Sequence, residues 1–245
     1  MDFNQVTSRI SKSDKLEFGA ILTKTFELYK KVWLQGFFTL LFGLLLIAPF
    51  YVLLYIPMIA AGVTEPDMLK SEEMSPVLGL MMMVLMPILM VAAMTTAIAL
   101  NAAFLRICHH KYHNLDVQDD YFYFFKNGRW KKSLALGLIM LVMAFLGAMM
   151  CGVGIIYFVV PISLLPAFFA FAESLSPIEI TKASLQLANK NWLVIFGLIL
   201  LTGFIAELGI ILCFVGILFT AMLSKIPMYF VYMDAMESAN DTEII

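Results

Sequence analysis

The stretch ASLQLANKNW (residues 183–192) closes a polar segment and leads at Trp192 into a long apolar run. The other two tryptophans occupy the same kind of position: Trp33 ends TKTFELYKKVW (23–33) and Trp130 ends YFYFFKNGRW (121–130). Each follows a Lys, Arg or Asn cluster and precedes an apolar segment. Tryptophan combines an apolar ring with a polar N–H and favours the headgroup region of a bilayer. The three tryptophans are therefore predicted to be interfacial anchors where the chain enters a membrane.

The composition is that of a membrane protein. Of the 245 residues, 62% are hydrophobic and 14% are charged, whereas a soluble domain is about half apolar and about one quarter charged. The net charge is −2, and no basic block is long enough to follow a phosphate backbone, which excludes a nucleic-acid partner. Cys108, Cys151 and Cys213 form no CxxC pair, so no disulfide framework is expected.

The apolar segments are long enough for six transmembrane helices. A bilayer core about 30 Å thick requires about 20 apolar residues per helix. Segments 32–63 and 77–105 each supply one span, and their prolines predict kinks. Segments 133–172 and 192–233 each supply two spans joined by a tight turn, with CGVG (151–154) and CFVG (213–216) as the candidate turns. The predicted fold class is therefore an all-α, polytopic membrane protein.

Basic residues predict the orientation, because the cytoplasmic loops of membrane proteins are enriched in Lys and Arg. Here the basic residues concentrate in the N-terminal stretch, in the loop after the second span and before the fifth span. The first outer loop, TEPDMLKSEEMS (64–75), is acidic, and the two CxVG turns carry no charge. Both termini are therefore expected to be cytoplasmic. Membrane lipids are the expected partners.

An internal repeat is present at an offset of 62 residues. Without a gap, Trp130 aligns with Trp192 and CGVG aligns with CFVG, and Gly147 aligns with Gly209. A third copy aligns at Trp33. We predict three units, at about 16–106, 114–173 and 176–236, each made of an in-plane helix and a helical hairpin. A flexible cytoplasmic N-terminus (1–15) precedes them, and a polar tail (237–245) follows them.

The sequence favours an in-plane helix at the start of each unit. Apolar residues from Phe18 to Trp33 follow one helical stripe with charges opposite. In SPIE (176–179), Ser176 is a predicted N-cap, Pro177 takes the first helical position and Glu179 closes a capping box. The middle segment, 116–127, is aromatic on all sides and is expected to pack under the bundle.

Three polar residues within the predicted spans form a candidate intramembrane site. Glu207 and Lys225 lie in the fifth and sixth spans, and Asn101 lies in the second. Ionisable groups in a membrane interior are costly and often functional, so one interpretation is a substrate or proton site. The alternative is a structural ion pair between Glu207 and Lys225, or a surface Glu with a snorkelling Lys, together with an interhelical hydrogen bond from Asn101.

The motif RICHHKYH (106–113) contains residue types that ligate metals. His109 and His113 are one helical turn apart, beside Cys108 and His110. These are the three histidines of the chain, and no second ligand cluster accompanies them. The motif is therefore interpreted as a polar helix end, and no metal or cofactor is expected.

The segment FAESLSPIEITKASLQLANKNW (171–192), followed by two spans with a CxVG turn and by IPMYFVYMDAME (226–237), resembles a superfamily of bacterial inner-membrane proteins. This superfamily includes the six-helix YciC-like proteins and the membrane domain attached to some glycerophosphodiester phosphodiesterases. Over roughly the last 75 residues, the matching positions are Glu173, Ser176, Pro177, Ala183, Ser184 (one residue early), Leu187, Asn189, Lys190 and Tyr232. The resemblance implies a six-helix membrane fold located in the bacterial inner (cytoplasmic) membrane. No soluble segment corresponds to the phosphodiesterase domain.

Two function classes agree with these features. The chain contains no GxSxG, HExxH or phosphate-loop motif, so no enzymatic activity and no catalytic residue is predicted. The first hypothesis is a scaffold or accessory subunit of a membrane complex, with other membrane proteins as partners. The second is a transporter or binder of a lipid-like or small amphipathic molecule, indicated by Lys225 and by spans broken at Pro161, Pro166 and Pro227.

Overall fold

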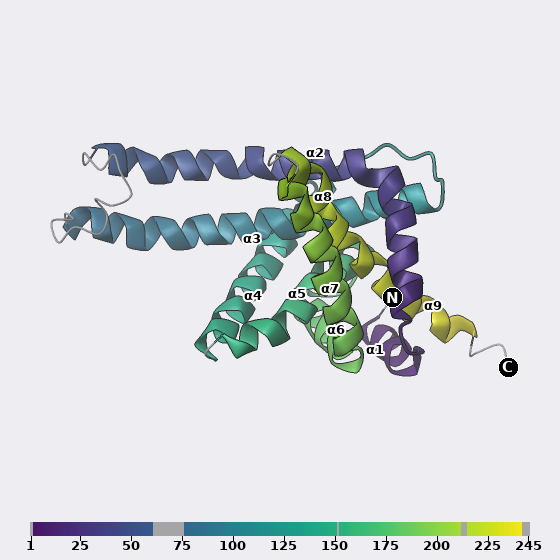
Figure 1. The fold of residues 1–245 in the computed structure, drawn as a ribbon. Helices are drawn as coiled ribbons and strands as arrows, with labels where there is room; N and C mark the ends of the chain where they lie inside the picture. The colour runs from purple at the N-terminus through teal and green to yellow at the C-terminus, as the bar shows by residue number, and fades with distance from the viewer. Residues whose placement is uncertain (1, 61–75, 151, 212–214, 242–245) are drawn as a thin grey trace.

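The structure is a computed structural model that describes residues 2–60, 76–150, 152–211 and 215–241. Within these ranges it contains helices and no strand (Figure 1), which confirms the all-α prediction. The α-helices are α1 (Phe3–Lys12), α2 (Phe18–Ala60), α3 (Pro76–Tyr112), α4 (Trp130–Met149), α5 (Val153–Phe171), α6 (Pro177–Lys190), α7 (Trp192–Glu207), α8 (Val215–Thr220) and α9 (Ile226–Asp241). The 3₁₀ helices are η2 (Tyr123–Phe125), η3 (Leu208–Ile211) and η4 (Ala221–Lys225).

Several of these helices are long and apolar enough to cross a membrane. In the described ranges there are five such segments: Phe18–Ile56, Gly79–Tyr112, Trp130–Met149, Val153–Phe171 and Gly216–Glu237. Helices α6 and α7 meet at a bend of 94°, and counting this pair as one broken span brings the number to six. The predicted outer loop at 64–75 and residues Cys151 and Cys213 of the two turns lie outside the described residues.

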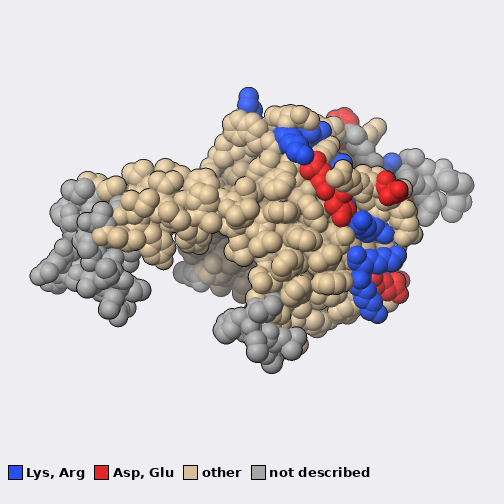
Figure 2. Space-filling model, turned by 90° about the horizontal axis from the view of Figure 1, so that it is seen from above, with Lys and Arg blue, Asp and Glu red and all other residues tan. Residues whose placement is uncertain are grey.

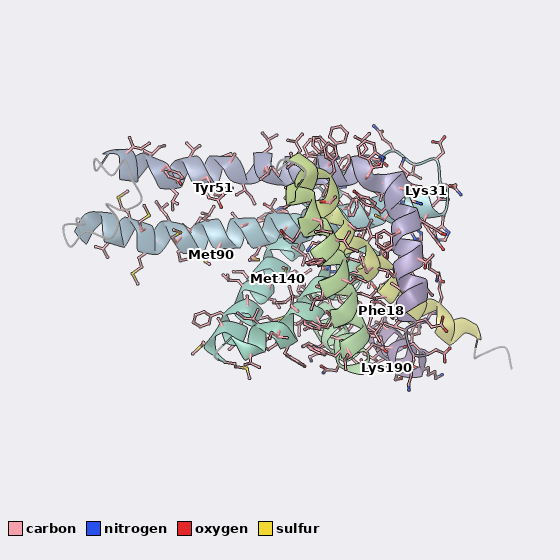
Figure 3. All side chains as sticks on the ribbon, in the orientation of Figure 1. Phe18, Lys31, Tyr51, Met90, Met140 and Lys190 are labelled. Atoms are coloured by element: carbon pink, nitrogen blue, oxygen red, sulfur yellow. The ribbon has the colours of Figure 1, made fainter. Side chains whose placement is uncertain are left out.

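Helix α2 changes direction near Lys31 (Figures 1 and 3). The part that begins at Phe18 carries the amphipathic stripe, of which Ile21 is fully buried while Phe18 and Trp33 are 37% and 44% exposed. Beyond the bend the sequence is apolar, and the chain remains helical through Pro49. The predicted in-plane helix and the first predicted span are thus two parts of one helix, which turns where one sequence pattern replaces the other.

Helices α2 and α3 continue as an antiparallel arm beyond the rest of the molecule (Figure 1). The side chains towards the end of this arm, such as Leu53, Ile59 and Met83, are exposed. At about 1.5 Å per residue, residues 31–60 extend about 45 Å, which exceeds a hydrocarbon core of about 30 Å. The arm therefore offers a long apolar surface of the kind that lipid tails cover.

Close contacts between glycines join the helices of the two shorter hairpins, α4–α5 and α7–α8. A Cβ atom on Gly154 would lie 2.8 Å from the carbonyl oxygen of Gly147. A Cβ atom on Gly209 would lie 2.8 Å from the carbonyl carbon of Gly216. Gly152, in the first turn, adopts a φ of 80°, which favours glycine. The second glycine pair lies 62 residues after the first, which is the offset of the predicted repeat.

The in-plane helix predicted over 116–127 does not form, and that prediction is wrong. Residues 115–122 form no helix, and only η2 follows. The carboxylate of Asp120 accepts the backbone N–H of Phe122, a local bond that competes with helix formation. Phe124 is fully buried, with its ring centroid 4.3 Å from that of Phe169. Tyr121 of the same segment is also partly buried, and this burial raises the pKa of its hydroxyl to about 12. The aromatic residues pack under the bundle individually, without a helix to carry them.

The N-terminal residues 1–15, predicted to be flexible, contain helix α1. Asp2 caps this helix, and Gln5 completes a capping box. Val6 and Ile10 are fully buried, and α1 packs against α6 and α9. The prediction missed this helix because its ten residues are mostly polar and only two of them reach the core. At the other terminus, α9 extends to Asp241, so part of the predicted polar tail is helical.

Charged side chains gather on the end of the molecule away from the arm (Figure 2). We call this the polar end; it comprises α1, α6, the bend of α2 and residues 113–129. Large side chains of α5 and α9, such as Phe168 and Tyr229, are fully buried and pack next to the polar end. The molecule thus has a charged, well-packed end and an apolar arm that points away from it.

Candidate functional site

A cavity of about 1080 Å³ lies between the α2–α3 arm, α7, α8 and η4. Its lining includes Asn101 from α3, Glu207 from α7 and Lys225 from η4. These are the three polar residues that the sequence places within spans. Most of the other lining side chains are apolar or small. The structure therefore brings the whole candidate intramembrane site to one cavity.

A proline explains the local backbone at Lys225. Pro227 lies in the first turn of α9, where its missing N–H costs no helical hydrogen bond. An α-helix running through this point would place the proline ring against the carbonyl of Leu223. The chain instead tightens into the 3₁₀ helix η4, and the N–H of Ile226 donates to that carbonyl. A 3₁₀ segment within a helix often marks either a functional hinge or a sequence under strain, and Pro227 is the local cause here.

The cavity is elongated along the arm and changes in polarity from one end to the other. On α2 its lining runs from Thr39 to Val52, a distance of about 20 Å at 1.5 Å per residue. Towards the polar end it is lined by hydroxyl, amide and ammonium groups of Thr39, Thr96, Asn101, Ser224 and Lys225. Along the arm, near Tyr51 and Met90 (Figure 3), the lining is mainly aliphatic. This gradient matches an amphipathic ligand.

The two charges of the cavity do not neutralise each other. Among the described residues, neither Glu207 nor Lys225 forms an ion pair or a side-chain hydrogen bond. The side chain of Glu207 is exposed, whereas Lys225 is half-buried. The structural ion pair that the sequence left open as an alternative is therefore not formed, and Lys225 places a cation next to the cavity without an ion-pair partner in the described chain.

The three predicted anchors lie at the surface. Trp33 and Trp130 are 44% and 48% exposed, and Trp192 is half-buried with its ring stacked on Phe196. The indole N–H of Trp192 donates to the carbonyl oxygen of Tyr157 at 3.4 Å. Trp33 and Trp130 are thus exposed enough to contact headgroups, while the ring centroid of Trp33 also lies 5.7 Å from that of Phe219 and Trp192 forms a contact within the bundle.

The histidines of RICHHKYH form a hydrogen-bonded cluster with Tyr229. The hydroxyl of Tyr229 lies 3.0 Å from Nδ1 of His109 and 3.5 Å from Nε2 of His113. Cys108 is fully buried. In the part of the chain that is described, no group of three or more His, Cys, Asp or Glu side chains is arranged to hold a metal ion. The arrangement ties the end of α3 to α9.

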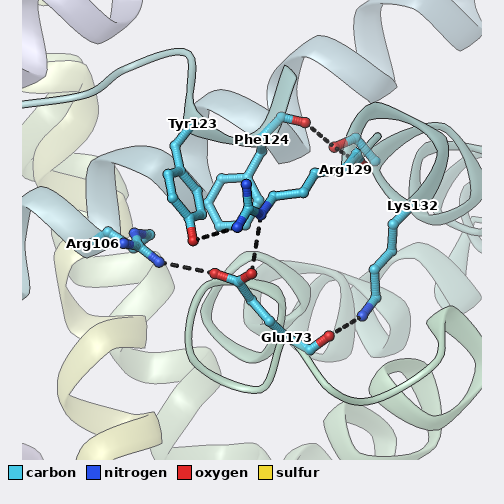
Figure 4. Close-up of polar contacts among 7 residues, drawn as sticks. Arg106, Tyr123, Phe124, Arg129, Lys132 and Glu173 are labelled. Carbon is cyan, nitrogen blue, oxygen red and sulfur yellow. Dashed lines mark hydrogen bonds and ion pairs between the residues drawn. The ribbon is translucent and has the colours of Figure 1, made fainter. Parts of the chain in front are cut away.

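A second polar cluster, at the polar end, centres on Glu173 (Figure 4). Its carboxylate binds Arg106 at 2.9 Å and Arg129 at 3.1 Å, and its carbonyl oxygen accepts a bond from Lys132. The guanidinium groups of Arg106 and Arg129 lie 3.7 and 4.1 Å from the ring centroid of Tyr123. Because each of these charged side chains already has a partner within the cluster, the cluster is suited to joining α3, α4 and the end of α5 rather than to binding a ligand.

Residues that carry the sequence resemblance hold helices together. Ser184 donates to the carbonyl of Pro161, and Lys190 binds the end of α1 through Ile10 and Ser13. Tyr232 is buried, with its ring near that of Phe168. Comparisons of the chain with known protein families, curated proteins and solved structures found no match. Function is therefore inferred from the site itself.

Proposed function

We propose that this protein is a non-catalytic, multi-pass protein of the bacterial inner membrane that binds a lipid-like or small amphipathic molecule. One observation carries the proposal: Asn101, Glu207 and Lys225, from three different helices, line a single elongated cavity that is otherwise mainly apolar. Small-molecule sites have this character, with volumes of about 300–1,000 Å³ and a few convergent polar groups. Binding sites of membrane transporters also lie where helices are broken, as at η4.

The proposed membrane arrangement has six spans in three units, with both termini cytoplasmic. The bend between α6 and α7 supports an in-plane helix that turns into the bilayer at Trp192. The two glycine pairs at the 62-residue offset support the relation between the second and third units. The gathering of charge at one end supports an aqueous, cytoplasmic position for that end. The resemblance to YciC-like proteins agrees with this arrangement.

Native mass spectrometry of the protein released from mild detergent tests the binding function. The wild-type protein is expected to retain an amphipathic molecule. In the variant Ala97→Trp, a large ring would fill the cavity that Ala97 lines, and the retained molecule should be lost. Leu45→Trp is the matched control, because Leu45 is 66% exposed on the same arm and does not line the cavity. Equal retention by both variants would contradict the proposal.

The scaffold function is a second candidate, supported by the exposed surface of the arm. Met83 is 75% exposed on α3, where helices of a partner protein have room to pack. A photoreactive amino acid at position 83 should then form an adduct with another membrane protein in living cells. The same substitution at Leu193, which is 79% exposed on α7, serves as the control. Adducts with lipid alone at position 83 would eliminate this candidate.

A further inference from the structure

We propose that the cavity selects an amphiphile with an acidic headgroup, whose anion lies at Lys225 and whose chain extends along the α2–α3 arm. This inference rests on the proposed function, because it assigns the chemical class of the molecule that the cavity binds. It adds the sign of the headgroup charge and the direction of the chain. Both follow from where the charged and apolar side chains lie.

The sign of the charge follows from the surroundings of Lys225. An ammonium group within a span is costly unless it is paired or hydrated. Lys225 is half-buried beside the cavity, and no carboxylate in the described chain pairs with it. Asn101 lines the same cavity, and its amide adds two N–H donors. A carboxylate or phosphate would supply the ion-pair partner that Lys225 lacks and accept these bonds.

Glu207 does not reverse this preference. It ends α7, and its side chain is exposed, so surrounding water or headgroups can stabilise its charge. The hydroxyl of Ser224 already donates to the carbonyl of Ala221 at 2.9 Å. Of the two charged groups that line the cavity, the Lys225 ammonium is therefore the one that most requires an oppositely charged ligand.

The direction of the ligand's alkyl chain follows from the apolar part of the cavity. From Lys225 and Asn101, the lining continues along the arm through Gly43, which has no side chain, and through the small residues Ala93 and Ala97, which leave room between α2 and α3. The cavity extends about 20 Å along α2. A lipid chain crosses half of a hydrocarbon core of about 30 Å, or about 15 Å. One alkyl chain therefore fits along the cavity, with the headgroup of the ligand towards the polar end.

Photoreactive probes that differ only in headgroup test the inference. The purified full-length protein, in phosphatidylcholine nanodiscs, is exposed to a photoreactive fatty acid, to the fatty alcohol or to the fatty amine of the same chain. The acid should label the cavity-lining peptides of α2 and α3 at about tenfold lower concentration than the alcohol or the amine, since losing the partner of a desolvated charge commonly costs more than tenfold in affinity.

Variants assign this preference to one residue. Lys225→Met should remove the advantage of the acid while the alcohol still labels the cavity, and Lys225→Arg should keep the advantage. Glu207→Gln and Lys131→Met, which removes an exposed Lys outside the cavity, should leave the preference for acid in place. Where a variant fails to fold, the comparison of the three probes on the wild-type protein still decides whether the cavity prefers an acidic headgroup.

The outcomes separate the two proposals. Equal labelling by the acid and the alcohol, or a preference for the amine that Glu207→Gln abolishes, would overturn the acidic headgroup and leave amphiphile binding intact. No labelling of the cavity by any of the three probes would overturn the proposed function as well. A preference for acid that persists in Lys225→Met would overturn the assignment to Lys225.

Discussion

At the scale of single residues, Trp192 has a structural contact beyond anchoring. Pro161 lacks an N–H, so the carbonyl of Tyr157, four residues earlier in α5, has no helical donor. The indole N–H of Trp192 donates to that carbonyl. Within membranes, neighbouring groups commonly satisfy the backbone that a proline frees. The tryptophan thus compensates for the proline of an adjacent helix.

Removing this indole N–H tests the contact. Trp192→Phe retains an aromatic ring but leaves the Tyr157 carbonyl without its donor, so the free energy of unfolding in detergent micelles should fall by about 1 kcal/mol. In a Pro161→Ala background the restored backbone N–H can satisfy that carbonyl, and the same substitution should cost less. Chemical denaturation measures both effects. An identical loss in the two backgrounds would show that the bond contributes nothing.

The glycine contacts give a second prediction at this scale. Gly154→Ala places a Cβ atom 2.8 Å from the carbonyl oxygen of Gly147, where backbone must move. Overpacking of this kind typically costs about 1–3 kcal/mol, measured as a fall in thermal stability. Gly19→Ala is the control, because no atom lies within 4 Å of its added Cβ and alanine favours a helix. Equal stability of the two variants would contradict the close packing.

At the scale of elements, Lys190 holds helix α1 in place. Its ammonium donates to the carbonyl oxygens of Ile10, Ser11 and Ser13 at 2.7, 2.9 and 2.6 Å. These acceptors lie at the C-terminal end of α1, where carbonyls lack helical donors and a cation is favourable. Only Val6 and Ile10 of α1 are buried, so this attachment contributes a large part of its docking, together with the bonds from Gln186 to the Thr7 carbonyl and from Arg9 to the Met236 carbonyl.

Lys190→Met should therefore release α1 without unfolding the membrane helices. Hydrogen bonds from a charged donor contribute about 1.5–3 kcal/mol, so amide exchange over residues 3–12 should accelerate by at least about tenfold. Lys182→Met, which removes an exposed Lys from the same helix, should leave exchange in α1 unchanged. Unaltered exchange in Lys190→Met would mean that apolar packing and these other bonds dock the helix without Lys190.

The cluster around Glu173 gives the second prediction for elements. Glu173→Gln removes the charge that lies between Arg106 and Arg129 and leaves two half-buried cations close together. A loss of about 1–3 kcal/mol in unfolding free energy is expected, measured by denaturation in detergent. Asp120→Asn is the control, because its partner Lys126 is largely exposed and such pairs contribute about 0–1 kcal/mol. A smaller loss for Glu173→Gln than for the control would contradict this role.

The sequence predicted the elements unevenly, for physical reasons. The apolar segments and the SPIE capping box appear in α2 to α7 as expected, because length and capping are local properties. Helix α1 was missed because a mostly polar helix depends on tertiary contacts such as that of Lys190. The helix over 116–127 was predicted in error, since individual packing of aromatic side chains overrode helical periodicity.

At the scale of the whole molecule, the candidate site could be predicted only in part. Asn101, Glu207 and Lys225 were each identifiable because a polar residue is rare in an apolar span. Their meeting at one cavity depends on how η4 and α7 pack against the arm. This packing could not be predicted, because the spans are apolar on all sides and their sequences do not indicate which face points inward. The absence of an ion pair between Glu207 and Lys225 likewise depends on that packing.

The proposed orientation gives the last prediction. If the polar end is cytoplasmic, a single cysteine at position 131 lies inside the cell and one at position 149 lies outside. Lys131 lies in the first turn of α4, directly after the polar end, and Met149 ends this helix and is 68% exposed. In a variant whose native cysteines are replaced by alanine, a membrane-impermeant maleimide added to intact cells should label Met149→Cys and spare Lys131→Cys. Both should react in opened vesicles, which controls for accessibility. The reverse pattern in intact cells would place the charged end outside, against the distribution of Lys and Arg that predicts the topology.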